Sequence, residues 1–210
     1  MAPPKCKVPA ASKITQAIVD SIKEDALKKK DEPARVAAAN KITEIVTASG
    51  VPEEPFLIQL LGVAITLAGD NKSKDVRAAA DIACAVFPTK LSEFAVRACL
   101  EPIFAGFNSQ FWQSKMRALE LIDNFVVRNP RAVAACLPEI IPELSQVMVD
   151  MRDEVKAKST DTMSKCGTCV GNIDIDPFIP TLIECIHAVD EVPACVHKLA
   201  ATTLVQQVEG

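Results

Sequence analysis

Apolar or small residues recur at steps of three and four along four stretches of the chain. This spacing places them on one face of an α-helix, whereas a half-buried strand would alternate every second residue. The four stripes, in chain order, are Val36, Ala39, Ile42 and Val46; Val76, Ala80, Ala83 and Phe87; Trp112, Met116, Leu119, Ile122 and Val126; and Val155, Ser159, Met163, Cys166 and Val170. The pattern predicts helices.

The helical stretches repeat with a period near 40 residues. Pro102, Pro142 and Pro180 are separated by 40 and 38 residues, and Asp-Glu-Val recurs at residues 153–155 and 190–192. Such a period is typical of solenoids in which neighbouring helix pairs bury each other's apolar faces. We expect an all-α solenoid at residues 13–210 after a flexible tail at 1–12. Its five helix pairs should cover about 13–49, 53–87, 90–129, 131–171 and 173–209.

Composition supports a helical protein and disfavours some classes of binding partner. Seven glycines and no tyrosine disfavour a β-sandwich or barrel, which needs many tight turns and aromatic strand residues. The net charge of −4 argues against binding DNA or RNA through bulk charge alone. The charge is uneven, because residues 1–30 hold seven lysines and three acidic residues while residues 171–210 hold one lysine and six acidic residues.

The chain shows no obvious membrane or export segment. The longest apolar run, residues 56–69, is interrupted by Gln59 and is short for a bilayer, and the first residues have no apolar core. Eight cysteines without an export signal are typical of free thiols in a reducing compartment. We therefore expect a cytoplasmic protein with no membrane partner.

A family resemblance follows from the repeat motifs. HEAT repeats place a proline in the first helix, an aspartate at the turn and Val-Arg or Val-Lys early in the second helix. The chain matches this in IIPELSQVMVDMRDEVKAK. More closely, residues 137–209 resemble the N-terminal HEAT region of translation elongation factor three, an ATP-dependent, ribosome-associated family of fungi and some algae and protists.

The resemblance implies a function for the array. Longer members carry ABC-type cassettes that bind ATP and magnesium, and they are thought to promote tRNA release from the ribosomal exit site. The chain would then be a fragment, a non-catalytic arm that docks the factor on ribosomal proteins and RNA, with the cassettes as its partner in cis. A HEAT scaffold of another ribosome-associated translation regulator is the alternative.

A basic residue recurs early in each of the first four second helices. These residues are Arg35, Arg77, Lys115 and Lys156, separated by 42, 38 and 41 positions. One interpretation is an internal ladder in which each cation pairs with an acidic residue of a neighbouring turn, such as Asp75, Asp150 or Asp153. The other is that nearby exposed cations extend the ladder into a partner-binding surface, with Lys72, Lys74, Arg117 and Lys158 as the candidates.

Catalytic motifs are weak. None of the seven glycines forms a G-x-x-x-x-G-K-[ST] phosphate loop, so we expect no ATP site, no other cofactor and no enzyme activity in residues 1–210. The pair Cys166 and Cys169 leaves a zinc or thiol-redox protein as a third hypothesis. Cys166 lies on the apolar stripe late in a helix, where the helix dipole opposes a thiolate, so packing is favoured.

Overall fold

The computed structural model describes residues 14–28, 30–169, 183 and 201. Within this part the chain forms α-helices and short 3-10 turns without a strand, which confirms the all-α solenoid. The α-helices are α1 (Gln16–Leu27), α2 (Glu32–Ala48), α3 (Glu54–Ala68), α4 (Lys74–Lys90), α5 (Val96–Phe107), α6 (Trp112–Arg128), α7 (Pro130–Val147) and α8 (Asp153–Gly167). The expected tail at 1–12 and nearly all of the expected fifth pair at 173–209 lie outside the described residues.

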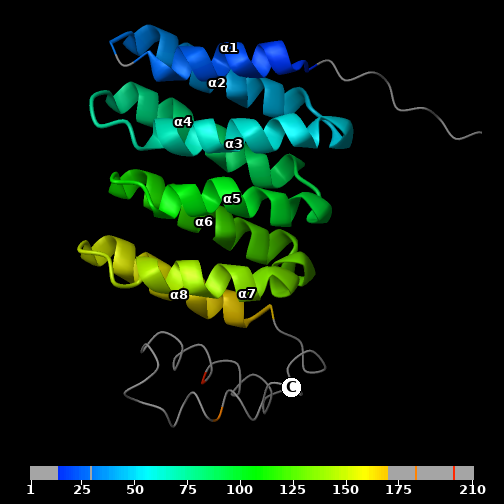
Figure 1. Ribbon diagram of the computed structural model, residues 1–210, viewed down its shortest axis with the longest axis vertical. Helices are drawn as coiled ribbons and strands as arrows, with labels where there is room; N and C mark the ends of the chain where they lie inside the picture. The colour runs from blue at the N-terminus through cyan, green and yellow to red at the C-terminus, as the bar shows by residue number, and fades with distance from the viewer. Residues whose placement is uncertain (1–13, 29, 170–182, 184–200, 202–210) are drawn as a thin grey trace, which may run out of the picture.

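The helices stack as successive antiparallel pairs along the long axis of the molecule (Figure 1). First helices pack on first helices, as α3 does on α5, and second helices on second helices, as α2 does on α4 and α6 on α8. The turns within the described pairs lie on one side, and together with the first residue of the helix after each turn we call them the turn edge (residues 28, 30–32, 69–74, 108–112 and 148–153). The connections between pairs lie on the opposite side, the joint edge (residues 49–53, 91–95 and 129).

Local sequence explains where several helices begin. The Asp31 carboxylate accepts a hydrogen bond from the Ala34 backbone N–H, and the Ser73 hydroxyl accepts one from Val76, so each caps a second helix. Proline stands in the first turn of α2, α3 and α7, where its missing N–H leaves no intrahelical bond unmade. Helix α7 continues as a single helix through Pro138 and Pro142.

The pattern of buried residues shows which positions of the four second helices are equivalent. Val76, Ala80, Ala83 and Phe87 of α4 are fully buried at steps of four, three and four. The same steps of buried residues give Arg35, Ala39, Ile42 and Val46 in α2; Ser114, Ala118, Leu121 and Phe125 in α6; and Val155, Ser159, Thr162 and Cys166 in α8. Successive helices are therefore offset by 41, 38 and 41 residues.

This correspondence corrects the expected alignment of the basic residues. Arg77, Lys115 and Lys156 share one repeat position, but Arg35 does not share it. Arg35 occupies the buried position that Val76 occupies in α4, and Val36 stands where the later helices carry a cation. Aligning the two helices by their Arg and Ala residues had matched Arg35 with Arg77, which is one residue out of register.

Within the described part of the chain, one helical stretch, Val51–Ala68, is long and apolar enough to cross a membrane by length and composition. Its residues Leu57, Leu60, Leu61 and Ala64 are fully buried in the core of the array. Packing of α3 between the neighbouring helices α1, α4 and α5 accounts for this apolar composition.

Candidate functional site

The first link between pairs is a buried ion pair at the turn edge. Arg35 of α2 pairs through Nη1 with Oδ2 of Asp70, and the two side chains are 7% and 9% exposed. Asp70 also accepts hydrogen bonds from the backbone N–H groups of Lys72 and Ser73 at 2.8 Å each. Arg77 donates from Nη1 to the Asp70 backbone carbonyl at 2.7 Å. Arg35 and Arg77, two of the predicted ladder cations, thus both bind Asp70, which was not among the predicted acidic partners.

Lys115 makes the corresponding link between the third and fourth pairs. Its Nζ lies 2.5 Å from Oδ2 of Asp150, one of the acidic residues predicted as a partner. The hydrogen bond from Lys115, together with one from the Arg152 backbone N–H, lowers the pKa of Asp150. Asp70 and Asp150 each follow their cation by 35 residues and accept from the N–H two residues on.

The other two predicted acidic residues do not link pairs. Asp153 accepts from Lys156 at 3.3 Å, within the first turn of the same helix, and both side chains are solvent-exposed. Asp75 forms no ion pair with any described residue. Lys156 thus pairs with a predicted acidic residue, although within one helix, and the expected ladder needs correction at Asp75.

Arg117 and Lys158 are not the free surface cations that we expected. Arg117 of α6 binds Asp81 of α4 through Nε at 2.7 Å and also pairs with Glu120. Lys158 of α8 pairs with Asp123 of α6, and the side chains of both lysine and aspartate are largely buried. Their charges are neutralised between second helices. The recurring separation of 35 or 36 residues between opposite charges was the sequence signal for these partners.

The cluster around Asp123 is the largest charge network of the described part. Lys165 donates to Asp123 at 2.7 Å and to Asp161 at 2.6 Å, and both hydrogen bonds raise the pKa of Lys165. The same bond to Lys165 is the main reason that the pKa of Asp161 is lowered. These bonds join α6 to α8 and leave little cationic charge for a partner.

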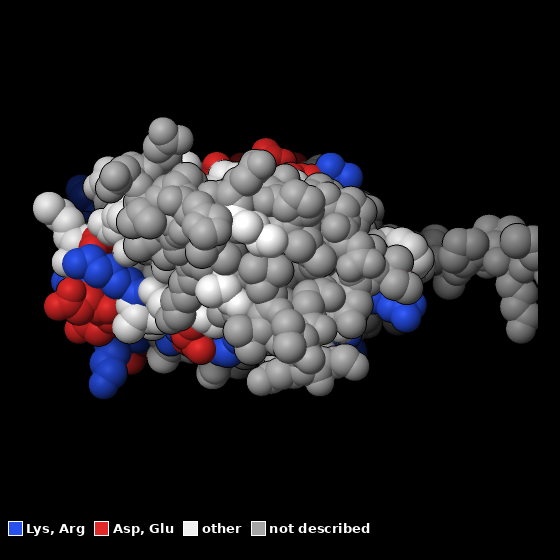
Figure 2. Space-filling model, turned by 90° about the horizontal axis from the view of Figure 1, so that it is seen from below, with Lys and Arg blue, Asp and Glu red and all other residues white. Residues whose placement is uncertain are grey.

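Lys72 and Lys74 are exposed on the turn edge, and no ion pair involves either within the described ranges. Further along this edge the Arg152 guanidinium lies over the Trp112 ring, 5.0 Å from its centroid, and the neighbouring Met151 is 99% exposed. Seen from below, blue and red residues lie side by side at the left of the view, so that part of the surface is mixed in charge (Figure 2).

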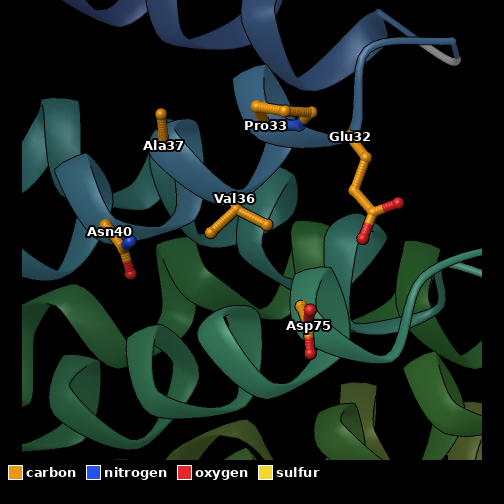
Figure 3. Close-up of a pocket in the computed structure, with 6 residues that line it drawn as sticks. All are labelled: Glu32, Pro33, Val36, Ala37, Asn40 and Asp75. Carbon is orange, nitrogen blue, oxygen red and sulfur yellow. The ribbon is translucent and has the colours of Figure 1, made fainter.

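A hollow of about 490 Å³ opens between α2 and α4. We call it the α2–α4 groove, and its lining residues are Glu32, Pro33, Val36, Ala37, Asn40 and Asp75. Glu32, Val36 and Asn40 extend from α2 toward α4, which contributes Asp75 (Figure 3). The Ser73 hydroxyl donates to Oε1 of Glu32 at 2.6 Å and holds that carboxylate at the rim.

The pair Cys166 and Cys169 lies in surroundings that disfavour a thiolate. Cys166 is buried, and burial raises its pKa to about 12, so the thiolate needed for metal binding or exchange is disfavoured. Burial also raises the pKa of Cys169. Among the described residues no three His, Cys, Asp or Glu side chains are grouped to hold a metal ion.

Stacked antiparallel helix pairs with a period near 40 residues define the chain as an α-solenoid of the HEAT type. The sequence profile described as "EF3 N-terminal HEAT repeat" matches residues 7–163. The chain belongs to this family, which confirms the resemblance drawn from the repeat motifs.

Individual relatives agree with the family match. Elongation factor 3 of Phytophthora infestans is 38% identical over 187 residues, covering 89% of this chain and 18% of that protein. Elongation factor 3A of Saccharomyces cerevisiae is 36% identical over 182 residues, covering 85% and 17%. The chain thus spans under a fifth of the length of these curated relatives. Among solved structures, a designed armadillo repeat protein aligns with a TM-score of 0.48 and 17% identity, covering 91% of this chain and 83% of that one.

Proposed function

We propose that this chain is the non-catalytic arm that docks a translation elongation factor on the ribosome. The observation that carries the proposal is the family match over residues 7–163, together with relatives that are elongation factors. These relatives favour an elongation factor over the scaffold of another translation regulator. The arm would serve an ATP-dependent cycle that releases exit-site tRNA in the cytoplasm. ATP and magnesium would be bound by ABC cassettes outside residues 1–210 of the same protein.

The turn edge is the surface that we assign to docking. Lys72 and Lys74 are exposed there, and neither is held in an ion pair with a described residue. Unpaired lysines can neutralise phosphates of ribosomal RNA or acidic side chains of ribosomal proteins. Arg117 and Lys158 are left out of the proposed surface because Asp81, Glu120 and Asp123 neutralise them.

Co-sedimentation of the chain with ribosomes tests the proposal. We expect the chain to pellet with ribosomes at low salt and to be released as salt rises, because each phosphate contact displaces counterions. Replacing both Lys72 and Lys74 by Glu should weaken pelleting and reduce the salt slope by about 2, roughly 1 for each lost lysine contact.

The matched control reverses two arginines on the opposite side. Arg128 and Arg131 are exposed near the joint edge and pair with no described acidic residue, so Arg128→Glu with Arg131→Glu produces the same change of net charge. This control should pellet like the unmodified chain. Equal loss in both double variants would remove the turn edge from the docking surface, and a chain that never pellets would refute docking by this arm.

A further inference from the structure

Helix α2 lacks a surface cation at the position where the other described second helices carry one. The equivalent residues are Arg77, Lys115 and Lys156, whereas α2 has Val36. The basic residue of α2 stands one position earlier, as Arg35, and points inward to the buried Asp70. The displaced cation therefore leaves an apolar surface at the boundary between α2 and α4, and the α2–α4 groove opens there.

The groove combines an apolar wall with an acidic rim. Pro33, Val36 and Ala37 give it apolar lining, and the acidic residues Glu32 of α2 and Asp75 of α4 line it as well. Glu32 extends from α2 toward α4 (Figure 3). Neither carboxylate forms an ion pair with Lys41 or Lys74, the exposed lysines of the same two helices. Ser73 satisfies one oxygen of Glu32 and leaves the other available.

We propose that the α2–α4 groove binds an arginine side chain presented by an extended segment of a partner protein. An arginine stem can lie along the wall formed by Pro33 and Val36, since its methylene groups bury well against apolar surface while the charged end stays at the rim. The planar guanidinium then lies between two carboxylates that can accept its forked N–H donors. Asn40, further along the groove, offers an amide to the backbone of the segment.

Charge selects a protein over a nucleic acid at this position. Two carboxylates without a cationic partner repel a phosphate backbone and attract a guanidinium. The groove thus differs from Lys72 and Lys74 on the turn edge, which have the opposite preference. The inference does not depend on ribosome docking, because the purified chain and a peptide are sufficient to measure it.

Fluorescence anisotropy with the 210-residue chain tests the groove, with fluorescein-labelled Gly-Arg-Gly-Arg-Gly as the probe. Glu32→Gln combined with Asp75→Asn should weaken binding about tenfold, because both charge-assisted contacts are lost. Val36→Lys, which gives α2 the cation that the other repeats have, should abolish measurable binding. The control Glu44→Gln with Glu101→Gln neutralises two exposed acidic residues outside the groove and should leave binding unchanged.

Three results would overturn the proposal, provided that circular dichroism shows folded variants. The first is no binding of the arginine probe to the unmodified chain, or equal binding by the groove variant and its control. The second is equal affinity for the matching Gly-Lys-Gly-Lys-Gly peptide, which would remove the preference for a guanidinium. The third is displacement of the probe by oligouridylate, which would place phosphate in the groove.

Discussion

At the turn edge, the first and second helix pairs are linked by a buried ion pair, whereas the second and third pairs meet there through small neutral residues. Arg35 and Asp70 form the first contact. At the second, the buried Ser114 hydroxyl donates to the Ile65 carbonyl at 2.9 Å, and Gly106 packs beside Ile65. At this edge two successive steps of one array thus use different chemistry, and the charge contact of the second step, Arg117 with Asp81, lies between the second helices instead.

The difference is already present in the turns. Asp70 accepts a hydrogen bond from the N–H two residues on, and Asp150 does the same two repeats later. In the turn between them Ser109 accepts the equivalent bond from Phe111 at 3.2 Å. Serine caps the turn as aspartate does, but it brings no charge to pair with a cation of the preceding helix pair. Close packing therefore holds the second and third pairs together at the turn edge, in addition to the ion pair of Arg117 with Asp81 between their second helices.

The largest effect should come from breaking the buried ion pair. Arg35→Ala leaves the Asp70 carboxylate buried without its partner, and we expect a loss of about 3–5 kcal/mol in the free energy of unfolding. Urea denaturation followed by circular dichroism measures it. Adding Asp70→Asn should restore part of the loss, because the amide oxygen still caps the turn and no unpaired charge remains. A loss below about 1 kcal/mol would place this pair among weak surface pairs.

The contact at Gly106 should be sensitive to side-chain volume and insensitive to charge. A Cβ at Gly106 would lie 2.8 Å from Ile65 Cγ2 and 3.0 Å from Ala118 Cβ, so Gly106→Ala forces the second and third pairs apart. We expect a loss of about 1–3 kcal/mol despite the better helix propensity of alanine. Thermal unfolding monitored at low and high salt measures it, and the loss should not depend on salt.

Gly62 provides the matched control for this glycine. It also lies within a helix, but an added Cβ would meet only Pro102 Cβ at 3.4 Å, which is ordinary contact. Gly62→Ala should therefore be neutral or stabilise the chain by up to about 1 kcal/mol. Equal destabilisation by both alanines would show that close approach at Gly106 is not what holds the two pairs together.

Sequence periodicity predicted the helices but not which charges meet. Apolar steps of three and four, such as those between Val76, Ala80 and Ala83, indicate a helix from the sequence alone. Arg35 was misaligned because it was matched to Arg77 by sequence letters alone, whereas its burial, which the pairing with Asp70 permits, shows that it stands one position earlier. Asp70 lies in a turn of the next pair, and its contact with Arg35 depends on how pairs stack, which one helix does not encode.

We expect an intermediate effect at the ion pair of Lys115 and Asp150, which links helix pairs as Arg35 and Asp70 do but is partly exposed to solvent. Lys115 and Asp150 are 22% and 12% exposed, so Lys115→Ala should cost about 1 kcal/mol at neutral pH. Because Lys115 lowers the folded pKa of Asp150, this stabilisation is present above the unfolded value of about 3.9 and is lost as pH falls through the folded pKa. Unfolding curves of both proteins from neutral to acid pH should therefore converge. A difference that persists at low pH would indicate lost packing by the lysine stem.

The smallest effect should come from Lys156, although it shares the repeat position of Lys115. Its partner Asp153 lies 3.3 Å away in the same helical turn, and both side chains are well exposed to solvent. Lys156→Ala should therefore change the free energy of unfolding by less than about 0.5 kcal/mol, and the change should vanish at high salt. Comparing Lys156→Ala with Lys115→Ala in the same urea titrations tests whether the repeat position or the ion-pair partner of a lysine determines the loss of stability. Equal losses at the two lysines would mean that position in the array, not the aspartate of the next turn, decides what a cation contributes.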